Sequence, residues 1–405
     1  MKKVKILWVA MMIFPFMFWS CHDKIILNYE LIYKDTLNII FWIFMQIIIP
    51  MVISAVMIFF FQDWLKTLKE SITAKPYVAV LISKHKRQTF QIPVDFLDGF
   101  DSVEFEKYFQ DIKNNHIQIE YYDDELDGAK SDAIIDKLIK DTNCIMIIAN
   151  ANSTLTRKNL DKLLSSGKKV PFIMPIATDY DIIEKAKERN FKGILRILPD
   201  NSRQSNCFVN FIVEKVKPEP NKPIVIFRDF DNQTYSDNFS EDIRTKLSEK
   251  KIQSTQYHIG GGNYINFNEF GFPSAMIYVG ISDNAKFLID HLNNTVPLIL
   301  TDGCFVSSVF HLSEKYAGNC YILSPIKLDK NANYEDIDYK LIGKDTYNIC
   351  KTILKNCYGK REKVYEYIES NKTRITIDNY KFDSDGNTTL EYTIYPIEGQ
   401  SLKIE

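Results

Sequence analysis

The stretch that decides the fold runs from residue 144 to residue 174. It opens with an apolar run, Cys144-Ile145-Met146-Ile147-Ile148-Ala149. Residues 157–164 then place apolar side chains at helical spacing, and a second apolar run, Val170-Pro171-Phe172-Ile173-Met174, follows. Short apolar runs separated by an amphipathic helix are typical of parallel sheets flanked by helices. The stretch therefore predicts one strand–helix–strand unit.

The same alternation continues on both sides of this unit. The expected strands are residues 77–82, 117–122, 145–149, 170–174, 193–197, 224–227, 252–259, 275–279, 296–300 and 320–323. The expected helices include residues 102–113, 129–140, 157–164, 239–249 and 284–292. Two such sheets in series form two doubly wound α/β lobes, which bind ligands at the carboxyl ends of their strands. Residues 380–397 differ, because alternating residues around Asp385-Gly386 predict a hairpin.

Composition and motifs exclude several classes of function. The 405 residues are 45% hydrophobic and 25% charged with a net charge of −2, which does not suggest a nucleic-acid binder. Seven cysteines form no Cys-x-x-Cys pair, so no zinc site or other metal site is expected. The six histidines lie in no recognisable triad context, and the glycines at 260–262 match no nucleotide motif. We therefore expect a protein that is not an enzyme and has no cofactor.

The N-terminal region has the composition of a membrane anchor. Residues 39–61 carry no charge, and as a helix their length of about 34 Å crosses a hydrocarbon core about 30 Å thick. The sequence thus predicts an anchor at residues 1–64, a linker at 65–76 and a soluble domain at 77–405.

A shorter apolar run at residues 6–20 leaves two interpretations open. It is either a first transmembrane helix or a secretory signal, and Ser20-Cys21 resembles a lipoprotein signal in which Cys21 would be acylated. Lysines at 2, 3 and 5 precede this run, and lysines at 66, 69 and 75 follow the second one. Because cytoplasmic flanks are rich in Lys and Arg, the soluble domain should face the cytoplasm, with an extracytoplasmic domain as the alternative.

The order of motifs resembles the type I periplasmic binding protein fold, in particular the branch that binds leucine, isoleucine and valine. The resemblance spans residues 77–397. It rests on Tyr122-Asp123-Asp124, the run 144–154 ending in Asn152-Ser153-Thr154, the phrase 170–178, Arg196-Ile197-Leu198-Pro199-Asp200, and Tyr380-Lys381-Phe382-Asp383-Ser384-Asp385-Gly386-Asn387. It implies a first lobe at 77–180 plus 297–325, a second lobe at 181–296, and a C-terminal crossing segment and hairpin at 326–405.

The resemblance also implies where a ligand lies. In that family an amino-acid-like molecule binds between the lobes, and by motif position Ser153 and Thr178 would hold its carboxylate. A hydroxyl and backbone N–H groups just after a strand suit an anion. The alternatives are a helix N-cap for Ser153 and a turn hydroxyl for Thr178.

In the second lobe, Tyr235 matches the family's aromatic residue after the strand that opens that lobe. Tyr278 or Ser282 falls near a second contact, and Asp302 falls near the position where an acid meets the ligand's ammonium group. A structural role is the alternative, since Tyr278 lies within an expected strand and Asp302-Gly303-Cys304 departs from the family's usual context.

These observations predict a membrane-anchored, non-enzymatic protein that binds a small amino-acid-like molecule and signals through lobe closure as a sensor or receptor. Its partners would be that ligand, the membrane, and a homodimer mate or a membrane protein. The alternatives are an extracytoplasmic substrate-binding lipoprotein of an ABC-type amino-acid transporter, and a structural scaffold without a ligand.

Overall fold

The computed structural model divides the chain into two compact units, residues 1–74 and 75–405. It describes residues 44–73, 75–82, 91–100, 117–149, 153–230, 233–260, 271–292, 295–306, 309, 318–325, 339–357, 359–377, 380–398 and 401–402. The apolar run 6–20, Cys21 and the first five residues of the predicted span 39–61 lie outside the described residues.

The described part of the first unit is helical. A π-helical turn, η1 (Phe44–Ile48), leads into α4 (Ile49–Thr73). The predicted linker 65–76 is wrong for residues 65–73, which continue the helix because they are rich in Leu and Lys and contain no Gly or Pro. Among the described residues, no helix is both long enough and apolar enough to cross a membrane.

The second unit begins with a five-stranded parallel sheet. The strand order is β2-β1-β3-β4-β5, with bounds β1 (Tyr77–Leu81), β2 (Gln118–Tyr122), β3 (Cys144–Ile148), β4 (Phe172–Met174) and β5 (Ile194–Arg196). Alternate residues of β1 enter different cores, because successive side chains of a strand point to opposite faces. Val78 and Val80 belong to one core, and Tyr77, Ala79 and Leu81 to the other.

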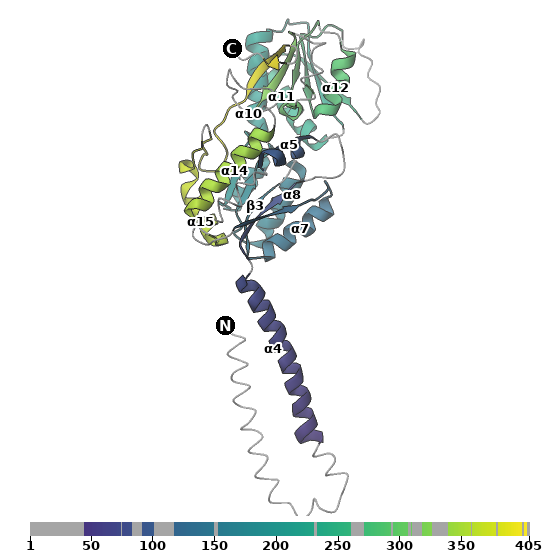
Figure 1. Ribbon diagram of the computed structural model, residues 1–405. Coiled ribbons are helices and arrows are strands. Elements are labelled where there is room, and N and C mark those ends of the chain that lie inside the picture. The colour runs from purple at the N-terminus through teal and green to yellow at the C-terminus, as the bar shows by residue number, and fades with distance from the viewer. Residues whose placement is uncertain are drawn as a thin grey trace, which may run out of the picture. The chain divides into compact units, whose positions relative to one another are not determined.

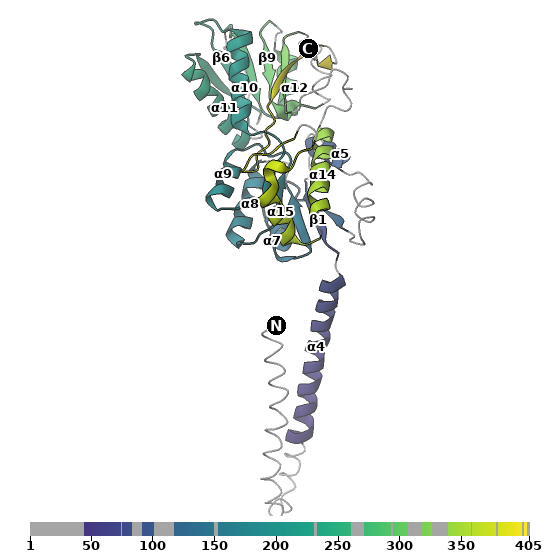
Figure 2. The same cartoon turned by 90° about the vertical axis from the view of Figure 1, so that its left-hand side faces the viewer.

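Helices cover both faces of this sheet (Figure 1). One face packs against α5 (Gln91–Phe100) and α14 (Tyr339–Asn356), and the other against α7 (Gly128–Lys140) and α8 (Ser153–Ser166). Figure 2 shows α15 (Arg361–Asn371) beside α14, although both follow the last parallel strand of the chain. The first lobe is therefore completed by a late segment of the sequence.

The second sheet has seven strands in the order β12-β11-β10-β9-β8-β6-β7. Their bounds are β6 (Ile224–Asp229), β7 (Ser254–Ile259), β8 (Ala275–Val279), β9 (Leu298–Leu300), β10 (Cys320–Ser324), β11 (Thr393–Glu398) and β12 (Ser401–Leu402). One face packs against α10 (Asn201–Phe211) and α11 (Gln233–Glu249), and the other against α12 (Ser282–His291). The prediction of two doubly wound α/β lobes is confirmed.

The structure corrects three details of the predicted organisation. Strands β9 and β10 lie in the second sheet, so segment 297–325 does not belong to the first lobe. Helix α9 (Asp181–Glu188) and β5 belong to the first lobe, so the second lobe does not begin at residue 181. The predicted hairpin forms around Asp385-Gly386 but is short, with an antiparallel bridge between Phe382 and Thr388 and backbone hydrogen bonds from 381–383 to 387–389, because β11 pairs with β10 instead of continuing it.

Three segments connect the two lobes, and we refer to them as the crossing segments. The first, residues 197–200, joins β5 to α10; the second, 326–338, precedes α14 and lies outside the described residues. The third, residues 375–392, joins η7 (Lys372–Arg374) to β11 and is hydrogen-bonded to the end of β5. The Arg196 N–H donates to Gly386 O at 2.8 Å, and the Thr388 N–H donates to Arg196 O at 3.1 Å.

Candidate functional site

The carboxyl ends of the first sheet bring together the two predicted first-lobe residues. Ser153 is the first residue of α8, and its hydroxyl accepts a hydrogen bond from the Asp179 N–H at 3.3 Å. Thr178 lies after β4 and is buried. The Ser153 hydroxyl therefore contacts the loop that carries Thr178, as expected for two polar residues at neighbouring strand ends.

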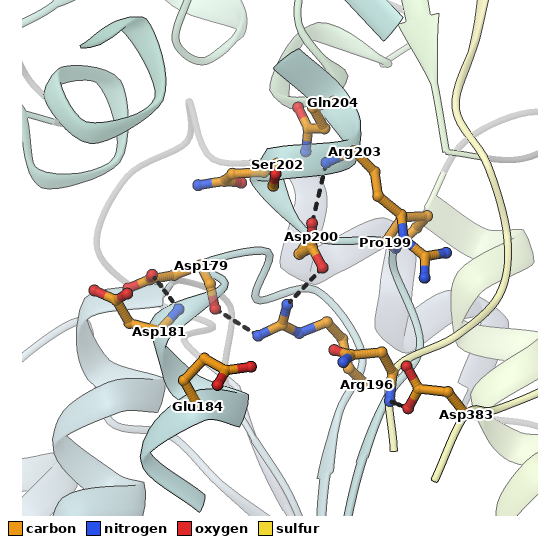
Figure 3. A network of polar contacts seen from close by, with 12 residues as sticks. Asp179, Asp181, Glu184, Arg196, Pro199, Asp200, Ser202, Arg203, Gln204 and Asp383 are labelled. Atoms are coloured by element: carbon orange, nitrogen blue, oxygen red, sulfur yellow. Dashed lines mark hydrogen bonds and ion pairs between the residues drawn. The ribbon is translucent and has the colours of Figure 1, made fainter. Parts of the chain in front are cut away.

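Charged side chains hold the loop of residues 178–181 in place. Arg157, one turn into α8, pairs with both Asp179 and Asp181. Figure 3 shows the Arg196 guanidinium between Asp179 and Asp200, donating to Asp179 O at 2.5 Å and lying 3.8 Å from Asp200 Oδ2. Burial lowers the pKa of Arg196, and the two carboxylates oppose that shift. The position of the 178–181 loop is thus set by two arginines.

The carboxyl ends of the second sheet hold a buried carboxylate, Asp302, at the start of η4 (Asp302–Cys304). Its Oδ1 accepts from the Tyr235 hydroxyl at 2.9 Å, and its Oδ2 accepts from Gln204 Nε2 at 2.9 Å and lies 3.2 Å from the Tyr392 hydroxyl. The Tyr339 hydroxyl donates to Asp302 O at 3.3 Å. We call these five residues the Asp302 cluster.

Burial controls the protonation of this cluster. It raises the pKa of Asp302 from an ordinary value of 3.8 to about 6, against the lowering effect of hydrogen bonds from Tyr235, Tyr392, the Gly303 N–H and Gln204. Burial also raises the pKa of Tyr235, Tyr339 and Tyr392 well above their ordinary value. These tyrosines are therefore neutral near pH 6, where Asp302 titrates.

Tyr278 and Ser282 lie apart from the Asp302 cluster. Tyr278 is completely buried in β8, and its hydroxyl lies 2.8 Å from both Asp229 Oδ2 and Ile281 O. Asp229 also accepts from Asn284 Nδ2 at 2.9 Å, so Tyr278 completes a polar network within the second lobe. These contacts favour the structural alternative for Tyr278. Ser282 begins α12, and its side chain lies outside the described residues.

Gln204, Tyr392 and Arg196 complete the site but were not selected from the sequence for this role. Asp200 caps α10 by accepting a hydrogen bond from the Arg203 N–H at 3.0 Å, so it marks the start of that helix. Gln204 therefore lies in the first turn of α10. Tyr392 is 188 residues further along the chain, so its contact with Gln204 at 2.7 Å has no local signal. Among the described residues, no group of three or more His, Cys, Asp or Glu could hold a metal ion.

The fold is that of known solute-binding proteins, whereas the sequence is far from theirs. No protein-family model and no curated protein matches the sequence. A leucine-binding protein from Thermotoga maritima is 15% identical with a TM-score of 0.67, covering 82% of this chain and 97% of that one. A branched-chain amino-acid transporter substrate-binding protein from Streptococcus pneumoniae, in complex with isoleucine, is 14% identical with a TM-score of 0.66. The match covers 82% of this chain and 98% of that one.

A solute-binding protein of an ABC transporter from R. palustris, in complex with benzoate, is 14% identical with a TM-score of 0.65 and covers 82% and 95% of the two chains. The likeness extends over almost the whole of each solved structure and over 82% of this chain. The second unit therefore has the two-lobed α/β fold of type I periplasmic binding proteins.

Proposed function

We propose that this protein is a membrane-anchored, non-enzymatic receptor that binds a small amino-acid-like molecule between its two lobes. The observation that carries the proposal is that polar groups converge at the carboxyl ends of both sheets, where ligands of doubly wound folds bind. On the first lobe these are Ser153 and Thr178, and on the second they are Tyr235 and Asp302.

The first lobe would hold the ligand's carboxylate. Ser153 stands at the N-terminus of α8, where the positive end of the helix dipole favours an anion. The Ser153 hydroxyl can donate to a carboxylate while it accepts from the Asp179 N–H. Thr178 would add a second hydroxyl from the neighbouring strand end.

The second lobe would meet the opposite end of the ligand through Tyr235, with Asp302 behind it. The Tyr235 hydroxyl is held by Asp302, and its ring packs edge-on against Phe239 at 5.6 Å between centroids. Asp302 is only 3% exposed, so an ammonium group would have to replace one of its present hydrogen-bond donors. Asp302 would therefore act on the ligand mainly by orienting Tyr235.

Adding a ligand should stabilise the domain, and Ser153→Ala should reduce that effect. A ligand at about 100 times its Kd stabilises the folded state by about 2.7 kcal/mol. We would follow thermal unfolding of the full chain by circular dichroism with leucine, isoleucine, valine and benzoate. Tryptophan fluorescence is unsuitable, because all four tryptophans lie within the first 64 residues.

The matched control is Ser165→Ala, an exposed serine at the other end of the same helix, which should keep the full ligand-induced shift. Each variant is compared with and without ligand, because Ser153→Ala by itself costs about 1 kcal/mol through the lost hydrogen bond from the Asp179 N–H. 4-Methylpentanoate, which is leucine without its ammonium group, tests the second-lobe contact. If no compound shifts the unfolding of the wild type, the scaffold alternative is favoured.

The anchor and the side of the membrane belong to the same proposal. The described apolar side chains of α4 support an anchor, since Met51, Phe59 and Phe60 are each more than 60% exposed. The flanking lysines favour a cytoplasmic domain, whereas the likeness to substrate-binding proteins of transporters favours the extracytoplasmic alternative. A reporter fused after Glu405 distinguishes them, and external reporter activity would exclude the cytoplasmic orientation.

A further inference from the structure

Internal hydrogen bonds occupy the carboxylate of Asp302 almost completely. An ionised carboxylate has about four acceptor positions, two on each oxygen. Tyr235 donates to Oδ1 at 2.9 Å, Gln204 donates to Oδ2 at 2.9 Å, and the Gly303 N–H donates a further hydrogen bond. The Tyr392 hydroxyl lies 3.2 Å from Oδ2 and takes up the remaining position. The buried carboxylate can therefore accept a new donor only by giving up one that it already has.

The other described carboxylates near the carboxyl ends of the second sheet also have partners within that lobe. Asp229 ends β6, is fully buried, and accepts from the Ile281 N–H at 3.1 Å and from Asn284 Nδ2 at 2.9 Å. Asp237 of α11 pairs with Arg228 at 3.4 Å. Among the side chains described at this edge, no carboxylate is thus available to pair with a cation on a ligand.

The first lobe offers a cation no better partner. The carboxylates of the loop that Ser153 contacts, those of Asp179 and Asp181, both pair with Arg157. An ammonium group enclosed between the lobes would lose its hydration without a charged partner to compensate for it. If it displaced Tyr235 from Asp302, the hydroxyl would lose the acceptor that it now has. An uncharged group incurs neither cost.

We propose that the ligand is a monocarboxylate that lacks an ammonium group. Such a ligand resembles an amino acid in its carboxylate and its uncharged side chain, so this inference rests on the proposed function and narrows it. Ser153 and Thr178 hold the carboxylate, and Tyr235 receives the uncharged end with its ring and its hydroxyl oxygen. Asp302 is then a positioning residue, which fixes the Tyr235 hydroxyl and does not touch the ligand.

Paired compounds that differ only in the ammonium group test the inference. Isothermal titration calorimetry of the full chain in detergent measures the Kd of leucine and 4-methylpentanoate, and of phenylalanine and 3-phenylpropanoate, with titration into detergent alone as the blank. The measurements are made at pH 8, where Asp302 is ionised and therefore most favourable to an ammonium group. In the pair that binds more tightly, the compound without the ammonium group should have a Kd about tenfold lower, the equivalent of one hydrogen bond.

The possible failures of this experiment can be told apart. Equal binding of the two members, or tighter binding of the amino acid, would overturn the inference and leave the proposed function standing. If none of the four compounds binds, the proposed function itself is contradicted, and the inference falls with it.

Tyr235→Phe gives a second expectation, of opposite sign. It removes the donor from Asp302 Oδ1 and opens an acceptor position, which should shift the ratio of the two Kd values about tenfold toward the amino acid. The matched control is Tyr278→Phe, the same substitution beside buried Asp229, which should leave the ratio unchanged.

A ratio of Kd values cancels any general loss of affinity, so it separates the role given to Tyr235 and Asp302 from a merely structural one. An unchanged ratio in Tyr235→Phe would contradict the inference. If that variant does not fold, Gln204→Leu takes its place, because it opens an acceptor position on Oδ2 and should shift the ratio in the same direction.

Discussion

Replacing Gly386 with alanine is expected to lower the free energy of unfolding by about 4 kcal/mol. Gly386 has a φ of +98° in the turn that brings the third crossing segment to β5. A Cβ atom there would lie 2.2 Å from Ile194 O, which is backbone of a buried strand and cannot move aside. The turn would have to leave β5 and lose its hydrogen bond from the Arg196 N–H.

Urea unfolding followed by circular dichroism measures this effect, and Gly167→Ala separates its two causes. Gly167 also has a positive φ, of +64°, but no described atom lies within 4 Å of its added Cβ. It should lose only about 1 to 2 kcal/mol, the usual cost of a left-handed alanine. Equal losses in the two variants would show that the close approach to Ile194 does not matter.

Replacing Arg361 with alanine should cost about 3 to 5 kcal/mol. The buried Arg361 side chain donates from Nε to Cys144 O at 2.8 Å, from Nη1 to Ile139 O at 3.0 Å and from Nη2 to Leu138 O at 2.8 Å, and also reaches Asp141 O. It thereby joins α15 to the end of α7 and the start of β3. Its removal leaves buried carbonyl groups without these donors.

The same unfolding measurement on Arg374→Ala provides the control, because Arg374 is an exposed arginine in the same region of the chain and should change stability by less than about 0.5 kcal/mol. Arg361→Lys should recover only part of the loss, since a single ammonium group cannot reproduce the fork of a guanidinium. A loss below 1 kcal/mol in Arg361→Ala would mean that α15 is held by its apolar contacts alone, through residues such as Val364 and Ile368.

The residues of the candidate site remain predictions, and the structure brings only some of them together. Ser153 and Thr178 were selected by motif position in the resemblance, and the structure places both after strands of one parallel sheet, whose ends lie side by side. Tyr235 and Asp302 were selected by their positions in the resemblance, and the structure joins them by a hydrogen bond. That Asp302 is enclosed by Gln204, Tyr339 and Tyr392 could not be foreseen, because those residues come from three distant parts of the chain.

The sequence by itself determined the order of the parallel strands, but not the helices α14 and α15 within residues 326–405. All ten expected parallel strands are present, from β1 to β10, because an apolar run of four to eight residues bounded by polar turns is a local property. It did not determine which sheet each strand joins. β9 and β10 extend the second sheet, and β11 pairs with β10 instead of lengthening the short hairpin at 381–389, since buried strands of similar composition are interchangeable until the packing of their helices is fixed. Tertiary structure alone decided that α14 and α15 return to complete the first lobe, and thereby that Tyr339 of α14 reaches Asp302 of the second lobe.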